Sequence, residues 1–527
     1  MILQGSPYVY EASRSSYEND FSSQPPGLVT PSSVISVGVP GLEPVLGGGL
    51  PQGHIYLIDG DPGTGKTTLG LQYLREGAAR HEPVLYITLS ESERELREVA
   101  GSHGWGLEGI TIFEMLPLEE SLRNDEQYTV LYPGEVELSA TIKAIVKAME
   151  ELQPKRVVFD SLSELRLLAR EPLRFRRQLL ALKQYFAGRD CTVLLLDDHT
   201  AGEEQRDIQS IVHGVVRLEN LAREYGTKRR RLEVLKMRGM VFREGFHDYN
   251  IRTGGLVVHP RLVAIEHLTS FDSTAVRSGI DELDALLGGG LNRGTSTLCI
   301  GPAGAGKSSI SLRYAAAAAE RGDYSYYVTF DEGLVTLLER AEGLGMPARR
   351  LIESGRLRID VVDPAELSPG HFIARVRHQV EREGASVVVI DSLNGFLAAM
   401  PGEEYLTIQL HELLAFLNNK GVASILVMAQ YGILGQGMFN PVDVSYLADT
   451  ILLLRYFESG GAVHQAISVV KKRSGRHERT IRELQLGPDT IRVGRPLSEF
   501  QGVLTGVPSY VGPQAPLLEG CDGGSRS

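Results

Sequence analysis

The chain has 527 residues, of which 42% are apolar and 23% charged, with a formal net charge of −12 at pH 7. A chain of this length is too long to fold around one compact core, and it predicts about two to four domains. The acidic balance argues against a chain made mainly to coat nucleic acid, so nucleic acid is not expected as a partner. The sequence offers neither the ~18 consecutive apolar residues of a membrane helix nor a signal peptide, and we expect a cytoplasmic protein without membrane contact.

In chain order, residues 1–30 are rich in Ser, Tyr and Pro and predict a disordered arm. From there, short β-branched runs alternate with helical stretches, as in HIYLIDG, TTLGLQYLREGAARH and PVLYITLS. This alternation predicts βαβ units on a mainly parallel sheet, and therefore the α/β class. We expect a first domain over 31–262, a linker near 260–274, a second domain over 263–506 and a flexible tail over 507–527.

The second domain repeats the first. GVPGLEPVLGGGLPQGHIYLIDGDPGTGKTT begins at Gly38, and GIDELDALLGGGLNRGTSTLCIGPAGAGKSS begins at Gly279. Later segments also match, since RVVFDSLSEL is followed by SVVVIDSLNGF, and RRLEVLKMRG by HQAISVVKKRSG. The spacing is that of a whole-domain duplication and is too long for a solenoid unit.

Each copy contains a GxxxxGK[ST] motif between a predicted strand and a predicted helix. Glycines let successive backbone N–H groups face phosphates, and the lysine reaches the β- and γ-phosphates. The motif therefore predicts two ATP sites. Their predicted residues are Gly60, Asp61, Pro62, Gly63, Thr64, Gly65, Lys66, Thr67 and Thr68 in the first copy, and Gly301, Pro302, Ala303, Gly304, Ala305, Gly306, Lys307, Ser308 and Ser309 in the second.

Two apolar strands close on a carboxylate, VVFD at Asp160 and VVVID at Asp391. Taken alone, either Asp can be the cap of a following helix. In both copies, however, the acid follows a P-loop at similar spacing, which predicts that it joins the hydroxyl of Thr67 or Ser308 in binding Mg²⁺. ATP and Mg²⁺ are the cofactors that the sequence predicts.

Phosphoryl chemistry also needs a carboxylate that orients or deprotonates the nucleophile. Glu91 in ITLSES and the pair Asp331 and Glu332 in VTFDEG follow the second strand of each copy. The first copy has Ser90 where the second has Asp331. We expect Glu91, Asp331 and Glu332 to be catalytic, together with the P-loop lysines. The alternative is a solvated helix start that is rich in acids.

The GGGL starts, the paired P-loops, the acids after VTF and the LKMRG strand together resemble the KaiC family over residues 34–506. The resemblance implies tandem RecA-like ATPase domains in a hexameric double ring, with autokinase activity in the second domain and ATP at subunit interfaces. It implies that Lys236, Arg238, Lys471 and Arg473 reach the nucleotide of the neighbouring subunit, and it suggests an adaptor similar to KaiB. Without the resemblance, these cations can belong to a basic strand end.

The family phosphorylates an adjacent Ser–Thr pair in the second domain, and the matching segment here is DVSYLADT. Ser445 and Tyr446 then stand at the phosphoacceptor positions. The Tyr446 hydroxyl lies beyond an aromatic ring, and a misplacement of about 1 Å can cost ~10²-fold in rate, so we favour Ser445. The alternative is that both residues only cap and pack the strand. The first domain has SIVHGVV at this place and offers no acceptor pair.

Two other functions share these motifs. A RecA- or RadA-like DNA-dependent ATPase has the same core. We interpret the basic end of ENLAREYGTKRRR as a solvated hairpin, and the alternative is that such a motor would bind DNA there. An ATP-assembled ring scaffold without kinase activity would also need both P-loops, because bound ATP stabilises an interface.

Overall fold

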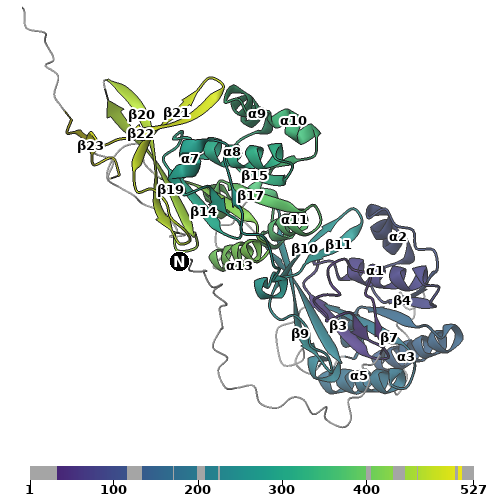
Figure 1. The fold of residues 1–527 in the computed structure, drawn as a ribbon. Coiled ribbons are helices and arrows are strands. Elements are labelled where there is room, and N and C mark those ends of the chain that lie inside the picture. The colour runs from purple at the N-terminus through teal and green to yellow at the C-terminus, as the bar shows by residue number, and fades with distance from the viewer. Residues whose placement is uncertain are drawn as a thin grey trace, which may run out of the picture.

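A computed structural model of the chain describes residues 33–115, 133–169, 171–198, 208–222, 226–398, 405–430, 445–459, 461–504 and 508–512. The predicted N-terminal arm, residues 1–30, lies outside them. Two nine-stranded sheets form the two halves of the molecule (Figure 1). The α/β class with mainly parallel central sheets is therefore confirmed. The exact domain boundaries stay a prediction.

The first sheet has the order β11-β10-β9-β8-β3-β7-β6-β4-β5. Its strands from β8 to β5 are parallel, and β9, β10 and β11 extend the sheet as antiparallel strands. The strands are β3 (Ile55–Gly60), β4 (Val84–Thr88), β5 (Ile110–Glu114), β6 (Arg156–Asp160), β7 (Thr192–Asp198), β8 (Gly214–Leu221), β9 (Arg229–Met237), β10 (His247–Arg252) and β11 (Gly255–His259). The helices are α1 (Lys66–Ala79), α2 (Glu93–Ser102), α3 (Pro133–Leu152), α4 (Leu162–Ala169) and α5 (Pro172–Phe186).

The second sheet repeats this topology strand for strand, in the order β16-β15-β17-β18-β14-β19-β20-β21-β22. The strands are β14 (Ser296–Gly301), β15 (Tyr324–Thr329), β16 (Leu357–Val361), β17 (Ala385–Asp391), β18 (Ala423–Ala429), β19 (Thr450–Ser459), β20 (Ala462–Lys472), β21 (Ile481–Gly487) and β22 (Thr490–Pro496). The helices are α7 (Asp281–Leu286), α8 (Lys307–Glu320), α9 (Leu334–Gly343), α10 (Ala348–Glu353), α11 (Pro369–Glu381), α12 (Leu393–Ala398) and α13 (Leu406–Asn419), with the 3₁₀ turns η1 (Ala264–His267) and η2 (Pro364–Glu366).

Three short strand pairs complete the described secondary structure. In each domain, a short strand, β1 or β12, precedes the Gly-rich start and pairs with the next strand, β2 or β13. The third pair lies near the C-terminus and includes part of the predicted tail. The strands are β1 (Val34–Ile35), β2 (Leu50–Pro51), β12 (Ala275–Val276), β13 (Leu291–Asn292), β23 (Phe500–Gln501) and β24 (Ser509–Tyr510).

The central strands are buried on both faces, which explains why their sequences are nearly continuous apolar runs. In the first domain, one apolar cluster lies between the sheet and α1 and α2, and another lies beneath α3, α4 and α5. The second domain has the same two layers. Because parallel strands end at one edge of each sheet, the P-loop and the acids that follow these strands gather there.

The two domains meet where α11 packs against β10 (Figure 1). Asp248, at this junction, accepts a hydrogen bond from the Gly370 backbone N–H at 2.7 Å, in the first turn of α11. The rings of His259 and His371 stack across it with centroids 4.7 Å apart. The junction therefore joins the antiparallel end of the first sheet to a helix that covers the second.

Candidate functional site

The first P-loop connects β3 to α1 at the carboxyl edge of its sheet. Gly63 and Gly65 have φ angles of 80° and 97°, a region that residues with side chains rarely adopt. A Cβ atom on Gly65 would also lie 2.5 Å from the Ile251 side chain. Tyr249 fixes the loop from β10 by donating to the Thr64 carbonyl at 2.7 Å. The loop thus has the curvature that lets N–H groups face an anion.

Lys66, at the start of α1, is buried and turned back into the loop. Its Nζ donates to the carbonyl of Gly60 at 2.6 Å and forms an ion pair with Asp198 at 2.8 Å. Asp198 ends β7, the strand beside β3. Sequence reasoning did not identify Asp198, although it follows an apolar strand in the same manner as Asp160.

Thr67 and Asp160 come together as predicted for a metal site, with the Thr67 hydroxyl 3.2 Å from Oδ2 of Asp160. Tyr86 donates to the same oxygen at 2.6 Å. Burial raises the pKa of Asp160, while its bonds to Tyr86 and Thr67 and the nearby charge of Lys66 oppose the rise. A hydroxyl and a carboxylate at one point are oxygen ligands of the kind that Mg²⁺ takes.

Glu91 lies just after β4, in a turn that is held by two hydrogen bonds between the Thr88 hydroxyl and the Glu91 backbone. Its Oε2 is buried and has no hydrogen-bond partner among the described residues. Burial raises the pKa of Glu91 to about 7, with the charges of Asp160 and Glu95 acting in the same direction and Lys66 against it. A carboxylate with this pKa can take up a proton near neutral pH.

The second P-loop repeats the first between β14 and α8. Gly304 and Gly306 have φ angles of 76° and 98°. Lys307 donates to the Pro302 carbonyl at 2.7 Å, and burial lowers its pKa. Asp391 accepts hydrogen bonds from the hydroxyls of Tyr327 and Ser308, and its pKa is raised by burial. The predicted metal residues of this copy therefore also meet.

Tyr86 and Tyr327 were missed by sequence reasoning. Both stand two residues before the Thr that ends the second strand of their copy, and both donate to the strand-end Asp. Their repetition in PVLYITLS and YSYYVTF was a signal that could have found them. The peptide bond after each of these Asp residues is cis in both copies.

The carboxylates of the second site make side-chain contacts that the Glu91 carboxylate lacks among the described residues. The backbone N–H of Glu332 bonds the Thr329 hydroxyl at 3.2 Å, which repeats the turn seen at Glu91. Its carboxylate, however, is paired with Arg340, and Asp331 accepts a hydrogen bond from Ser392. Arg340 was not predicted.

The four predicted interface cations all bind backbone carbonyls of their own chain. Lys236 donates to Gln209 and Val212 at 2.6 and 2.9 Å, and Lys471 donates to Ser445 and Ala448 at 3.0 and 2.7 Å. The partner arginines do likewise, with Arg238 bonded to the carbonyl of Ser210 and Arg473 bonded to that of Tyr446. In both copies the Lys-x-Arg pair therefore fixes the turn that precedes β8 or β19.

The predicted phosphoacceptors lie in that turn. Ser445 is half-buried, and Tyr446 is 55% exposed. Asp449 ties the segment to β14 through its bonds with the backbone and hydroxyl of Ser296, at 3.0 and 3.1 Å. Asp443 and Val444, which begin the DVSYLADT segment, lie outside the described residues.

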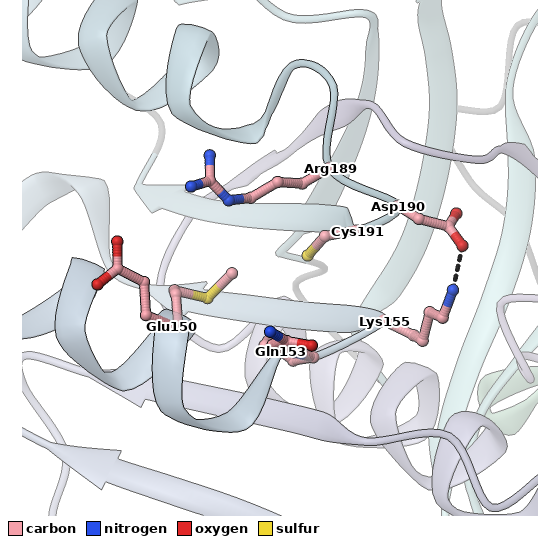
Figure 2. Close-up of a pocket in the computed structure, with 8 residues that line it drawn as sticks. Glu150, Gln153, Lys155, Arg189, Asp190 and Cys191 are labelled. Atoms are coloured by element: carbon pink, nitrogen blue, oxygen red, sulfur yellow. Dashed lines mark hydrogen bonds and ion pairs between the residues drawn. The ribbon is translucent and has the colours of Figure 1, made fainter.

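A pocket of about 350 Å³ lies at the opposite, amino-terminal end of β6 and β7 (Figure 2). Lys155 and Asp190 form an ion pair among the residues that line it, and the buried Cys191 also lines it. Burial raises the pKa of Cys191 to about 12, so the thiol stays protonated near neutral pH. The pocket lacks a P-loop and is separate from the nucleotide site.

Within the described part of the chain, no helix is both long and apolar enough to cross a bilayer. The same residues contain no cluster of three or more His, Cys, Asp or Glu side chains able to hold a metal.

The model of the KaiC ATPase family matches residues 35–263 and 276–498. The chain belongs to the KaiC family. It is 25% identical over 488 residues to the circadian clock protein KaiC3 of Synechocystis sp. (strain ATCC 27184 / PCC 6803 / Kazusa), covering 90% of this chain and 94% of that protein. It is 26% identical over 479 residues to the circadian clock oscillator protein KaiC of Acaryochloris marina (strain MBIC 11017), covering 90% and 91%. The KaiC resemblance is thus confirmed, and the fold is that of tandem RecA-like ATPase domains.

Proposed function

We propose that this KaiC-family ATPase hydrolyses ATP in its first domain and transfers the γ-phosphoryl group to its own Ser445 in its second. The observation that carries the proposal is the repeated meeting of a P-loop lysine, a hydroxyl and a strand-end Asp, beside an acid in the turn after the next strand. Two such sites in one chain, with unequal acids, support two unequal reactions. A scaffold that only binds ATP would not need an acid such as Glu91, whose buried Oε2 has no hydrogen-bond partner among the described residues.

At the first site, the oxygen of a water molecule attacks the γ-phosphorus of ATP and the bond to the bridging β,γ-oxygen breaks. Glu91 takes the proton from the water, so the products are ADP and inorganic phosphate. Lys66 leaves Asp198 to bind phosphate oxygens, and the loop N–H groups bind them as well. The pKa of Glu91, close to 7, suits a base that must take up and release a proton in each turnover.

The residues around each P-loop fit a magnesium ion, since a hydroxyl oxygen and a carboxylate oxygen meet in both domains. Thr67 and Asp160 would hold it in the first domain, and Ser308 and Asp391 in the second. When bound, Mg²⁺ neutralises charge on the phosphate oxygens. Tyr86 and Tyr327 keep the two carboxylates oriented through their hydroxyl donors.

At the second site, the Ser445 hydroxyl oxygen of a neighbouring copy attacks the γ-phosphorus, its proton passes to Asp331, and ADP leaves. The product is phosphoserine. Such a reaction needs a ring in which one subunit's acceptor turn faces another's P-loop, and we propose a homohexamer. Lys471 and Arg473 support this assignment because they hold the backbone of the acceptor turn. Adding about −1.5 to −2 charges beside Asp449 would alter that turn and a surface for a KaiB-like adaptor.

The alternative of a DNA motor receives no support from the basic segment at the start of β9. Arg229 is buried in an ion pair with Asp248, and Arg231 pairs with Glu219 and lies over the Phe246 ring. These cations stabilise the antiparallel end of the sheet. Binding of DNA that weakens steeply with salt would nevertheless favour the motor over the kinase.

The two reactions are separated by incubating the full chain with ATP labelled on its γ-phosphate. Wild type should release labelled phosphate and also retain label on the protein. Lys66→Ala should lower the release, whereas Lys307→Ala should abolish the retained label. Label that stays on the protein in Lys307→Ala would refute transfer at the second site. Assembled rings that neither release nor retain label would favour the scaffold.

A further inference from the structure

In the second site, the carboxylate of Glu332 is paired with an arginine of the same domain, Arg340. Both carboxylate oxygens of Glu332 accept hydrogen bonds from Arg340, which stands eight residues later in α9, with Nε 3.2 Å from Oε1 and Nη2 2.5 Å from Oε2. The remaining nitrogen, Nη1, donates to the Ser309 hydroxyl at 3.0 Å, in the first turn of α8. Arg340 therefore connects the acid to the helix that follows the P-loop.

The first site is built differently at the same positions. Val99 stands at the corresponding spacing after Glu91, and an apolar side chain cannot pair with a carboxylate. The hydroxyl that corresponds to Ser309 is Thr68, and it lies 3.3 Å from Nε2 of His103 instead. Glu91 accordingly keeps a buried oxygen without a partner among the described residues. The two copies thus share the acid and its turn but differ in whether a cation holds it.

A bidentate guanidinium–carboxylate pair constrains both members, because two parallel hydrogen bonds fix the distance and the plane. Arg340 is itself half-buried. Burial alone would lower its pKa, but the bond and charge of Glu332 outweigh burial and raise it. The guanidinium therefore stays charged, and each carboxylate oxygen of Glu332 already accepts a hydrogen bond from it. Asp331, in contrast, accepts a hydrogen bond from Ser392, and no arginine among the described residues is paired with it.

We propose that Arg340 is a positioning residue that withholds Glu332 from water activation, so that the second site hydrolyses ATP slowly and keeps the γ-phosphoryl group for transfer through Asp331. This inference rests on the proposed function and explains how two copies of one ATPase domain can favour different reactions. The competing account is a purely structural role, in which Arg340 only connects α9 to α8 through its bond with Ser309.

The test uses the full chain with Glu91→Gln, so that turnover reports the second site. Adding Arg340→Val, which installs the residue found at position 99, should raise kcat for hydrolysis at least about tenfold, because a positioned base supplies ~10²-fold or more. KM should change less than about twofold. Arg340→Lys should lie between the two, since an ammonium keeps the charge but cannot hold both oxygens. Arg349→Val removes an exposed arginine that pairs with Glu342 and should change nothing.

A kcat that stays the same or falls in Arg340→Val, with ATP still bound, would overturn the proposal and favour the purely structural role of Arg340. If that variant does not fold, the reciprocal change decides the question. Val99→Arg in a chain with Lys307→Ala should lower first-site kcat at least about tenfold with little change in KM, and an unchanged kcat would overturn the proposal. The proposed hydrolysis is judged separately, by whether Glu91→Gln lowers turnover in the otherwise unaltered chain.

Discussion

Asp248 bonds to residues of both domains, and its replacement is the perturbation whose cost follows most directly from the structure. The side chain is 5% exposed, and its Oδ1 accepts hydrogen bonds from Nε and Nη2 of Arg229, both at 3.2 Å. Its other oxygen accepts from the Gly370 N–H at the start of α11. Asp248→Ala would remove the carboxylate from a buried guanidinium and from a helix N-terminus at once.

Removing one partner of a buried ion pair costs about 3–5 kcal/mol, because the other charge stays buried. A hydrogen bond to a charged acceptor contributes about 1.5–3 kcal/mol, but the two terms share one carboxylate and are not additive. We therefore expect Asp248→Ala to lower the free energy of unfolding by about 4 kcal/mol. Asp248→Asn retains the shape and one acceptor and should cost less.

The assay is urea unfolding, followed by calorimetry that resolves whether the domains unfold together. The matched control is Glu98→Ala, which removes an acid from an ion pair with Arg94 whose side chains are 64% and 88% exposed and which should cost about 0.2–0.5 kcal/mol. We expect Asp248→Ala to separate the unfolding of the two domains. If its cost lies within about 0.5 kcal/mol of the control, the junction does not carry the stability assigned to it.

Three further predictions concern the nucleotide sites. Folding raises the pKa of Glu91 to about 7, so its charge destabilises the fold increasingly as pH rises toward that value; Glu91→Gln should raise Tm at pH 8 but not at pH 4. Asp198→Asn frees Lys66 from a half-exposed pair worth about 0.2–1 kcal/mol and should tighten ATP binding by the first site up to about fivefold, measured by calorimetric titration. Tyr86→Phe leaves Asp160 one donor short and should lower the free energy of unfolding by about 1–3 kcal/mol in urea.

The fold and the P-loops could be predicted because their signals are local and occur twice. A glycine-rich turn between a strand and a helix, and an apolar strand that ends on Asp, are each read within ten or so residues. Because the domain is duplicated, each motif found in one copy could be checked against the same motif in the other. The same repetition would have revealed Tyr86 and Tyr327, whose hydroxyls meet the strand-end acids in both copies.

Features that occur in one copy only could not be predicted in this way. Glu332 precedes α9 and Arg340 lies within it, so their pairing depends on which face of the helix Arg340 occupies. The sequence alone does not show this, because an arginine on a helix is usually solvated. The bond between Lys66 and Asp198 joins the first residue of α1 to the last residue of β7, which are distant in sequence. The Lys-x-Arg pair occurs in both copies, but its place at a strand end does not reveal that its cations bind the carbonyls of the turn before β8 or β19.

Transfer to Ser445 is the central claim, and peptide mass spectrometry after incubation with Mg²⁺ and ATP tests it most directly. The account predicts phosphate on Ser445 in wild type, and none at that position in Lys307→Ala or Ser445→Ala. Phosphate on Tyr446 alone would show that the acceptor was assigned to the wrong hydroxyl. A wild-type chain that hydrolyses ATP but carries no phosphate in this turn would contradict the account, and Ser445 would then serve only to pack the entrance of β19.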